Sequence, residues 1–221
     1  MRRYTDWMGV AALVTAAGSG TRFGGLKQFA ELTPSFRLVD AAVVTARSVS
    51  AWVGVILPDG YQWDGIAIDG SSKGGASRRE SIGAGLALLP SWVDTVLIHS
   101  ASHPLATSAT AKRAIDAVAG GADGAVPWLA AVDVIKELHD DDSLTTVGRE
   151  GLGSAQSPMA FKRSILDRAF ATDGQATEES QLVEAIGGRI VAVAGQLDNV
   201  HVVDDNSLAL ARTIAAGRGV V

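Results

Sequence analysis

A glycine-rich segment near the start of the chain has the residue types that hold a phosphate group. Residues 16–28 read AAGSGTRFGGLKQ, so a glycine turn is followed by two cations, Arg22 and Lys27. Backbone N–H groups of such a turn donate to phosphate oxygens, and the cations neutralise charge that develops during a transfer. Phe23 breaks a dinucleotide fingerprint, and Gln28 after the lysine breaks a Walker A loop. The pattern predicts a loop that binds a nucleoside triphosphate, with a tight turn and solvated cations as the alternative.

A second segment places small residues and hydroxyl groups at the expected start of a helix. Residues 73–81 read KGGASRRES. A helix N-terminus favours phosphate groups or polar base and ribose atoms. Ser77 followed by Glu80 also fits a capping box, in which the side chains bond to the backbone of the first turn. The two interpretations are compatible, and this segment alone does not decide between them.

Four later segments are polar, but each by itself is more typical of structure than of chemistry. In HSASHP at 99–104, His99 and His103 have the spacing of a metal-binding pair only if they lie on a helix. A strand end is expected here, so we do not expect both histidines to bind a metal. The other three segments are residues 149–158, 177–180 and 198–201.

The composition is that of a globular protein with one domain. The chain has 221 residues, 47% hydrophobic and 19% charged, and we interpret residues 1–221 as a single domain. The net charge of −5 argues against binding to nucleic acid, which needs a basic surface. The absence of cysteine excludes disulfides, cysteine-bound zinc and thiol catalysis. No apolar run reaches the ~20 residues of a membrane span, so we expect a cytoplasmic protein with no membrane partner.

Short apolar runs alternate with amphipathic segments along the chain. This alternation predicts an α/β protein with an open, mainly parallel sheet and helices on both faces. Such sheets bind ligands at the carboxyl ends of their strands, where the glycine-rich segments fall. We expect strands at 10–15, 53–57, 65–68, 95–99, 124–126, 189–194 and 200–203. We expect helices at 38–49, 77–89, 108–118, 159–170 and 178–186, and another from Ser207 onward.

Residues 129–157 interrupt this alternation. The stretches 131–138 and 143–147 have the character of two strands around the acidic turn 140–142, which predicts a protruding β-hairpin arm rather than a second domain. An arm that leaves a compact sheet commonly packs on another subunit. We therefore expect a homodimer that is joined through this arm.

Taken in order, the polar and glycine-rich segments form one extended pattern. It consists of Ala16-Ala17-Gly18-x-Gly20-x-Arg22 with Lys27-Gln28, Gly74-Gly75-x-x-Arg78-x-x-Ser81 with Gly85-Leu86, Ala101 and Pro104, Val132-Asp133-x-Ile135-Lys136, Arg149-x-Gly151-Leu152 with Gln156-Ser157-Pro158, Thr177, and Asn199-Val200. This pattern resembles the 2-C-methyl-D-erythritol 4-phosphate cytidylyltransferase family over nearly the whole chain. Several motifs in the right order make the resemblance specific, although each motif alone is weak.

The resemblance implies a fold, a reaction and an assembly. The fold would be the Rossmann-like fold of nucleotide-diphospho-sugar transferases, and the molecule a dimer joined through the arm. The reaction would transfer CMP from CTP to a sugar-alcohol phosphate and release pyrophosphate. The simplest acceptor is 2-C-methyl-D-erythritol 4-phosphate, a precursor of isoprenoids, and Mg²⁺ or another divalent metal would be the cofactor.

The resemblance also implies roles for individual residues. Arg22 and Lys27 would be catalytic, holding the triphosphate and stabilising the transition state. Arg149 and Thr177 would contact the phosphate of the acceptor, with Arg149 reaching over from the partner subunit. The nucleotide would be held by Ala16, Ala17, Gly18, Gly20, Gly74, Gly75, Ser81 and Ala101.

Three positions depart from the family pattern, which has Asp at Ser100, Arg at His103 and Lys at His201. In the family the aspartate holds the metal, and a neutral hydroxyl is a poorer Mg²⁺ ligand than a carboxylate. Asp198 is a candidate replacement. His103 and His201 would face the acceptor as imidazoles that are mostly neutral at pH 7.

These departures leave several explanations open. The enzyme could use another, less anionic polyol phosphate. It could run the same reaction weakly, with the metal held mainly by the triphosphate and water. It could be a catalytically impaired relative that only binds nucleotide, or a nucleotide-sugar pyrophosphorylase that uses another nucleoside triphosphate.

Overall fold

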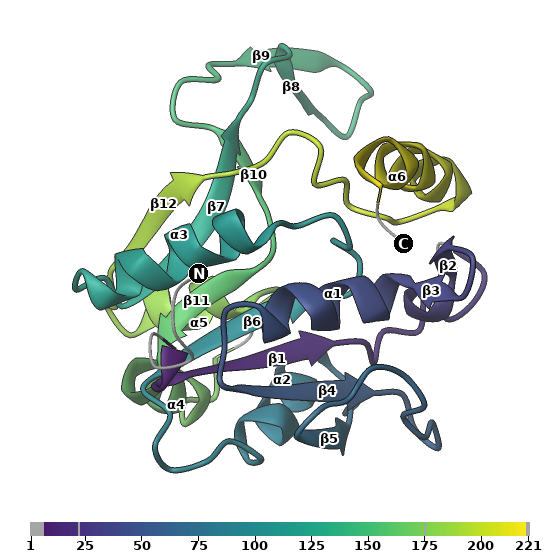
Figure 1. The fold of residues 1–221 in the computed structure, drawn as a ribbon. Helices are drawn as coiled ribbons and strands as arrows, with labels where there is room; N and C mark the ends of the chain where they lie inside the picture. Colours follow the sequence, from purple (N-terminus) through teal and green to yellow (C-terminus); the bar gives the residue numbers. More distant parts are fainter. Residues whose placement is uncertain (1–6, 22, 175, 220–221) are drawn as a thin grey trace.

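An eight-stranded sheet forms the centre of the molecule (Figure 1). The computed structural model describes residues 7–21, 23–174 and 176–219. The strands lie in the order β5 (Gly70–Lys73), β4 (Trp52–Leu57), β1 (Val10–Thr15), β6 (Thr95–Ser100), β11 (Met159–Lys162) and β7 (Gly124–Ala130), with β12 (Ile190–Ala194) and β10 (Gly153–Ala155) also paired to β7. The pairs that involve β10 or β11 are antiparallel and the others are parallel. The sheet is therefore mainly parallel, as predicted.

The first strand is buried on both sides because each face of the sheet carries its own hydrophobic core. The sequence of β1, VAALVT, is a continuous apolar run, as expected for a strand between two helical layers. Val10, Ala12 and Val14 contact one core, and Ala11 and Leu13 contact the other. The packing fixes the carboxyl end of β1, and the glycine-rich segment begins directly after it.

Helices cover both faces of the sheet (Figure 1). One face carries α1 (Leu38–Arg47) and α3 (Ser108–Ala119). The other carries α2 (Arg78–Leu86), α4 (Arg163–Phe170) and α5 (Glu179–Ala185). A third core joins α6 (Asp205–Arg218) to β2 (Glu31–Thr33), which follows the short helix η2 (Lys27–Phe29) and pairs with β3 (Phe36–Arg37). Among the described residues, no helix is both long and apolar enough to cross a membrane.

The predicted arm projects from one end of the sheet as a β-hairpin (Figure 1). Its strands are β8 (Ile135–Leu138) and β9 (Leu144–Val147), which pair antiparallel with Leu138 opposite Leu144. The chain leaves the main sheet at the end of β7 and returns through β10, which pairs with the last part of β7. The hairpin is confirmed, with shorter strands than expected, and its packing on a partner stays a prediction.

Two predicted strands are wrong. Residues 65–68 form a bend and irregular chain, and the edge strand β5 follows them with the sequence GSSK, which has no hydrophobic pattern to reveal it. Residues 200–203 also form no strand. The apolar pattern here comes from Val202, which is buried in the core beneath α6 without forming a strand. Its N–H donates to the carbonyl of Ser102 at 2.8 Å.

The helix predicted over residues 159–170 begins four residues too early. Met159–Lys162 is the strand β11, which inserts antiparallel between β6 and β7, and α4 begins only at Arg163. Met159, Ala160 and Phe161 are all buried. A short, fully buried apolar run has no period that separates a strand from a helix, which explains the error.

Candidate active site

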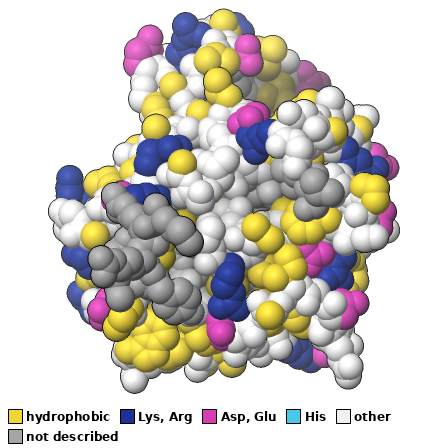
Figure 2. Space-filling model, viewed as in Figure 1, with side chains coloured by type: hydrophobic (Ala, Val, Ile, Leu, Met, Phe, Trp, Pro, Cys, Tyr) yellow, Lys and Arg dark blue, Asp and Glu magenta, His cyan; other side chains and the backbone are white. Residues whose placement is uncertain are grey.

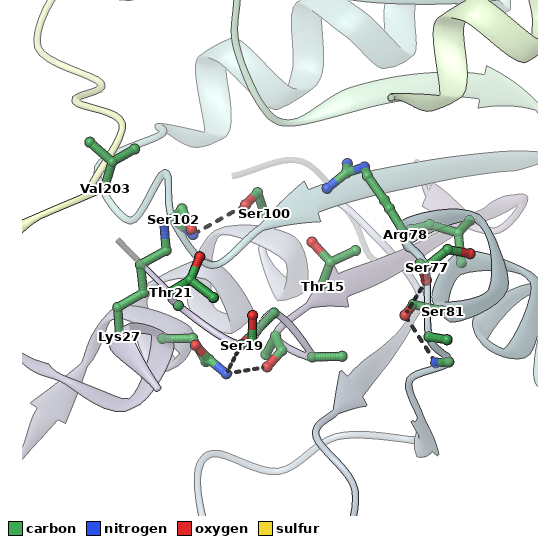
Figure 3. Close-up of a pocket in the computed structure, with 18 of the residues that line it drawn as sticks. Thr15, Ser19, Thr21, Lys27, Ser77, Arg78, Ser81, Ser100, Ser102 and Val203 are labelled. Atoms are coloured by element: carbon green, nitrogen blue, oxygen red, sulfur yellow. Dashed lines mark hydrogen bonds between the residues drawn. The ribbon is translucent and has the colours of Figure 1, made fainter. Parts of the chain in front are cut away.

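A cavity of about 480 Å³ opens at the carboxyl ends of β1 and β6, beside the start of α2 (Figure 3). This is the edge at which an open α/β sheet binds its ligands. The described residues that line the cavity are Thr15, Ala16, Ala17, Gly18, Ser19, Gly20, Thr21, Lys27, Gln28, Gly75, Ala76, Ser77, Arg78, Ser81, Ile82, Ser100, Ser102, His201 and Val203. The cavity thus unites the two glycine-rich segments that the sequence analysis singled out.

The first glycine-rich segment folds into a turn that requires a glycine at position 20. Gly20 has φ +63°, and a Cβ there would lie 1.8 Å from the carbonyl oxygen of Gly25. The turn is closed by hydrogen bonds from Phe23 N to Gly20 O and from Lys27 N to Gly25 O, both 2.8 Å. The catalytic candidate Arg22 lies outside the described residues.

Gln28 stabilises this turn through hydrogen bonds to its backbone, a role that the sequence analysis missed. Its amide nitrogen Nε2 donates to the carbonyl oxygen of Ala16 at 2.6 Å and to that of Gly18 at 3.1 Å. The side chain is 3% exposed. A buried amide that is satisfied by two backbone carbonyls fixes the path of the loop, since loss of either bond leaves a buried polar group unpaired.

Lys27 brings a permanent cation to the cavity wall. It begins η2, and its Nζ donates to the carbonyl oxygen of Val202 at 2.7 Å. That bond joins the glycine-rich segment to the chain that leads into α6. Lys27 therefore lies between two walls of the cavity, where it can meet an anionic ligand (Figure 3).

The second glycine-rich segment forms a capped helix start, in which the Ser77 half of the predicted capping box is present and Glu80 bonds to Ala76 instead of Ser77. Ser77 is the N-cap of α2, and its Oγ accepts from Glu80 N at 3.1 Å. The Ser81 hydroxyl accepts from Gly75 N at 3.1 Å, and the Glu80 carboxylate accepts from Ala76 N at 2.9 Å. Three backbone donors of this segment, those of Gly75, Ala76 and Glu80, are thus bonded to side chains of the same segment.

Gly74 lies beside the cavity rather than in its lining. With Lys73 and Pro58 it lines an adjoining hollow that also touches Ala17 and Gly75. A Cβ at Gly74 would lie 2.3 Å from the Cβ of Ala17. The two glycine-rich segments are therefore in contact, and glycine permits their close approach.

Ser100 closes a turn at the end of β6. Its Oγ accepts from Ser102 N at 3.2 Å, and its own N–H donates to the Ser157 hydroxyl at 2.7 Å. His99, just before it, is fully buried, and its Nε2 lies 3.1 Å from the carbonyl oxygen of His103. His99 is therefore a core residue, which agrees with the expectation that the two histidines do not form a metal pair.

His103 and His201 are adjacent although they come from distant segments. Their rings stack with centroids 4.5 Å apart and planes 13° apart. Burial, together with the charges of His201, His99, Lys27 and Arg78, lowers the pKa of His103 to about 3. Burial also lowers the pKa of His99 to about 4. Both imidazoles are neutral at pH 7, so the permanent cations near them are Lys27 and Arg78.

Three other predicted site residues lie outside the lining. Ala101 is buried directly behind it, with its N–H donating to Thr15 O at 3.1 Å. Thr177 lies just before α5, and its hydroxyl donates to Gln181 Oε1 at 2.9 Å. Arg149 is exposed on the arm and donates to the carbonyl of Val132. None of these positions tests the predicted ligands, which stay predictions.

The lining does not fit a metal ion that is held by the protein. Its polar side chains within the described residues are hydroxyls, one amide, one imidazole and cations, and none is a carboxylate. No group of three metal-binding side chains occurs among the residues described here. Asp198 is bound to Arg218 and accepts from Gln196 Nε2 at 2.9 Å, and Arg218 lowers its pKa. Magnesium sites normally include a carboxylate besides substrate phosphates and water.

Arg78 and Glu179 are the polar pair that sequence reasoning overlooked. Arg78 lines the cavity, and its guanidinium makes two hydrogen bonds to the carboxylate of Glu179. Arg78 belongs to the quoted motif, so it could have been singled out as a cation near the nucleotide. No sequence signal connects it with Glu179, because the two residues are 101 positions apart.

The mainly parallel sheet, the glycine turn after β1 and the cavity at the strand ends define a nucleotidyltransferase of the Rossmann-like type. A family model described as IspD, 2-C-methyl-D-erythritol 4-phosphate cytidylyltransferase, matches residues 10–216. The chain belongs to this family.

Relatives and solved structures agree with this assignment. The chain is 36% identical to the 2-C-methyl-D-erythritol 4-phosphate cytidylyltransferase of Rubrobacter xylanophilus, over 95% of this chain and 96% of that protein. It is also 36% identical to the enzyme of the same name from Chromobacterium violaceum, over 94% and 98%. The crystal structure of the Thermus thermophilus enzyme of that name superimposes with TM-score 0.82, at 26% identity over 95% and 100%. The predicted family and fold class are confirmed.

Proposed function

We propose that this protein transfers the cytidylyl group of CTP to 2-C-methyl-D-erythritol 4-phosphate and releases pyrophosphate, a step in making isoprenoid precursors. The observation that carries the proposal is the cavity in which the glycine turn and Lys27 meet at the carboxyl ends of β1 and β6. Membership in the cytidylyltransferase family supports the choice of substrates. The proposal includes a cytoplasmic location, where CTP is available.

The reaction needs an attack in line with a leaving group. An oxygen of the acceptor phosphate forms a bond to the α-phosphorus of CTP. The bond from that phosphorus to the bridging oxygen of the β-phosphate breaks, and pyrophosphate leaves with the electron pair. Such a transfer depends mainly on positioning and on stabilisation of negative charge. Lys27 would supply a fixed positive charge for this purpose, and Arg22 would supply the second by resemblance to the family.

The nucleotide side of the site consists mostly of backbone and small residues. Close approach of a ligand to backbone N–H groups is possible because the turn is built from alanine and glycine. The proposed contacts are the loop residues Ala16, Ala17, Gly18 and Gly20, the α2 segment with Gly74, Gly75 and Ser81, and the backbone at Ala101.

The acceptor side has fewer permanent charges. His103 and His201 would meet the acceptor there as a stacked pair, in which the buried His103 is neutral. Thr177 would contact the acceptor phosphate from the start of α5. Arg149 would add a permanent cation, and its place on the arm supports a contribution to the cavity of the partner subunit.

A dimer joined through the arm is part of this proposal. The arm exposes large apolar side chains that nothing in the described chain covers, and Figure 2 shows hydrophobic side chains on the protruding end of the molecule. Val132 is 76% exposed and Leu138 is 67% exposed. Apolar patches of this kind mark contact surfaces between proteins. The others on the arm are Val134, Leu144 and Leu152.

A divalent cation such as Mg²⁺ belongs to the proposal as a companion of the nucleotide. Because the described lining has no carboxylate, the cation would be bound by triphosphate oxygens and water rather than by the protein.

A second candidate function follows from the missing carboxylate of the described lining and the loss of permanent charge in the cavity. A site with Ser100 and a neutral His103 would also suit a relative that binds nucleotide without turnover, or one that uses a less anionic polyol phosphate.

A pyrophosphate-release assay separates these functions. The native protein is given CTP, UTP, GTP or ATP with each of several polyol phosphates, including methylerythritol phosphate. Release that requires CTP and methylerythritol phosphate supports the first proposal. Release with CTP and another polyol phosphate reassigns the acceptor. Binding of CTP by calorimetry without any release would leave the nucleotide-binding relative as the answer.

A further inference from the structure

Two consecutive arginines in the first turn of α2 hold the connection between α4 and α5. Arg79 Nη1 donates to the carbonyl oxygen of Gly174 at 2.9 Å, and its Nη2 donates to that of Phe170 at 2.7 Å. The same guanidinium lies 5.4 Å from the centroid of the Phe170 ring. Arg79 therefore fixes the end of α4 and the following turn against the start of α2.

Arg78 fixes the other end of that connection, at the start of α5. Its Nε donates to Glu179 Oε1 at 2.7 Å and its Nη2 donates to Oε2 at 2.9 Å. This fork geometry is the strongest arrangement between a guanidinium and a carboxylate. The Glu179 side chain is 2% exposed, so its charge would be uncompensated without Arg78.

The position of Arg78 is unfavourable for a purely structural cation. The N-terminus of a helix carries partial positive charge, so a cation in the first turn is repelled. Two backbone donors of the loop before α2 are already used, because Gly75 N bonds to Ser81 and Ala76 N bonds to Glu80. An anion that reaches this wall of the cavity meets the side chain of Arg78, which belongs to the lining.

The guanidinium keeps one edge toward the cavity. The edge with Nε and one N–H of Nη2 faces Glu179, and within the described part of the chain Nη1 makes no hydrogen bond. The Arg78 side chain is 39% exposed and lines the cavity. In Figure 3 it extends over the cavity from the side opposite Lys27. Its charge also acts on His103, so it faces the same region of the site.

We infer that Arg78 is a further substrate-binding residue, which donates from its open edge to a phosphate oxygen, and that Glu179 is the positioning residue that aims it. The inference rests on the proposed function, because the phosphate belongs to CTP or to the acceptor. Glu179 also neutralises the charge of Arg78. The contact therefore selects a phosphate oxygen by direction more than by charge.

The test compares Arg78→Lys, which keeps the charge but loses the fork, with the native protein. The expected result is a loss of affinity for one substrate of about 10- to 100-fold, the range for a lost hydrogen bond to a charged group. A rise in the KM of CTP, with weaker binding of CTP and inorganic pyrophosphate by calorimetry, assigns the contact to the triphosphate. A rise in the KM of the acceptor alone assigns it to the acceptor phosphate. Arg163→Lys, in the exposed pair with Asp167, is the matched control.

Glu179→Gln tests the positioning role, because it keeps the shape and removes the charge. It should impair the same substrate as Arg78→Lys, while the other KM stays within twofold of native. Arg78→Gln alone would leave the buried charge of Glu179 without a partner and could unfold the protein. The double variant Arg78→Gln with Glu179→Gln therefore replaces the ion pair by a neutral pair.

Folded variants that keep both KM values and both calorimetric affinities within twofold of native would overturn the inference. A native protein that binds phosphate probes but transfers nothing would overturn the proposed function while the calorimetric comparison still decides the inference. A native protein that binds no probe would overturn both.

Discussion

The imidazole rings of His103 and His201 stack with their centroids 4.5 Å apart at the edge of the cavity. His103 is 8% exposed, whereas His201 is exposed and forms part of the lining. Burial and the nearby charges of Lys27 and Arg78 keep His103 neutral, so its ring adds no charge to this region at pH 7. The His103 ring therefore provides a neutral surface at a place where the substrate is proposed to be anionic.

The buried histidines predict a loss of stability in mild acid. Burial lowers the pKa of His99 to about 4 and of His103 to about 3, from 6.5. Below about pH 6.5 the unfolded chain binds protons at both positions while the folded chain does not. The free energy of unfolding should therefore fall as the pH drops from about 6.5 toward about 3, and should not depend on these groups above that range.

Urea unfolding at several pH values measures this dependence. His99→Gln and His103→Gln should each flatten the slope, because the substituted side chain no longer titrates. His139→Gln, on the exposed arm, is the control and should keep the native slope. A native slope in both buried variants would mean that other groups cause the acid sensitivity.

His201→Lys should strengthen binding of the acceptor. The change puts a permanent cation on an exposed position of the cavity lining and removes one ring of the stack. We expect the KM of the acceptor phosphate to fall by about tenfold, equivalent to ~1.4 kcal/mol, with little change for CTP. Initial rates at varied acceptor concentration provide the measurement, and His139→Lys is the control. An unchanged KM would place the acceptor phosphate away from residue 201.

Lys27→Ala should remove nearly all transfer activity. The change deletes the cation that lies between the glycine turn and the segment before α6. We expect kcat to fall by on the order of 10²- to 10³-fold, as for other preorganised donors at a developing charge. Pyrophosphate release gives the rate, and Lys112→Ala on α3 controls for the loss of a surface cation. Near-native turnover would exclude Lys27 from the mechanism.

Ser100→Asp should place a carboxylate for a metal in the cavity, whose described lining has no carboxylate. An aspartate oxygen could still accept the N–H of Ser102, as the serine hydroxyl does. Electron paramagnetic resonance of added Mn²⁺ should detect binding to the nucleotide-free variant but not to the native protein. Ser108→Asp, at the exposed start of α3, is the control. Equal binding of Mn²⁺ by native protein and variant would show that the carboxylate is not what the site lacks.

From the exposed apolar arm we predict a dimer in which each active site contains residues of both subunits. Leu138→Asp with Leu144→Asp should convert the dimer into monomers by sedimentation equilibrium, while Leu210→Asp on α6 should not. If Arg149 serves the cavity of the partner, inactive Lys27→Ala and Arg149→Ala chains should regain activity when mixed, because one cavity of the mixed dimer is complete. A native monomer, or a mixture without activity, would contradict this prediction.

The features that could be predicted from the sequence are those determined by residues within one continuous stretch of the chain. β1 is a continuous apolar run that ends at a glycine turn, and the cap of α2 lies within residues 74–81. The hairpin of the arm also follows from a local pattern. Such features need no knowledge of what lies across the fold, because neighbouring residues determine them.

The features that were missed depend on contacts between distant segments. Arg78 meets Glu179 and His103 meets His201 only after the sheet has assembled. Gln28 looked like a departure from another motif until its two backbone acceptors were known. The strand β11 has the same apolar composition as a buried helix, so only its pairing with β6 and β7 decides its structure.

The self-capped start of α2 has a thermodynamic consequence for ligand binding. Ser77, Glu80 and Ser81 order this segment through its own hydrogen bonds, so the entropy of fixing it is lost during folding. A nucleotide that arrives there has fewer residues to immobilise, and more of its contact energy remains as affinity. This wall of the pocket is therefore preorganised. The side chains that select the ligand there are already ordered before the ligand binds.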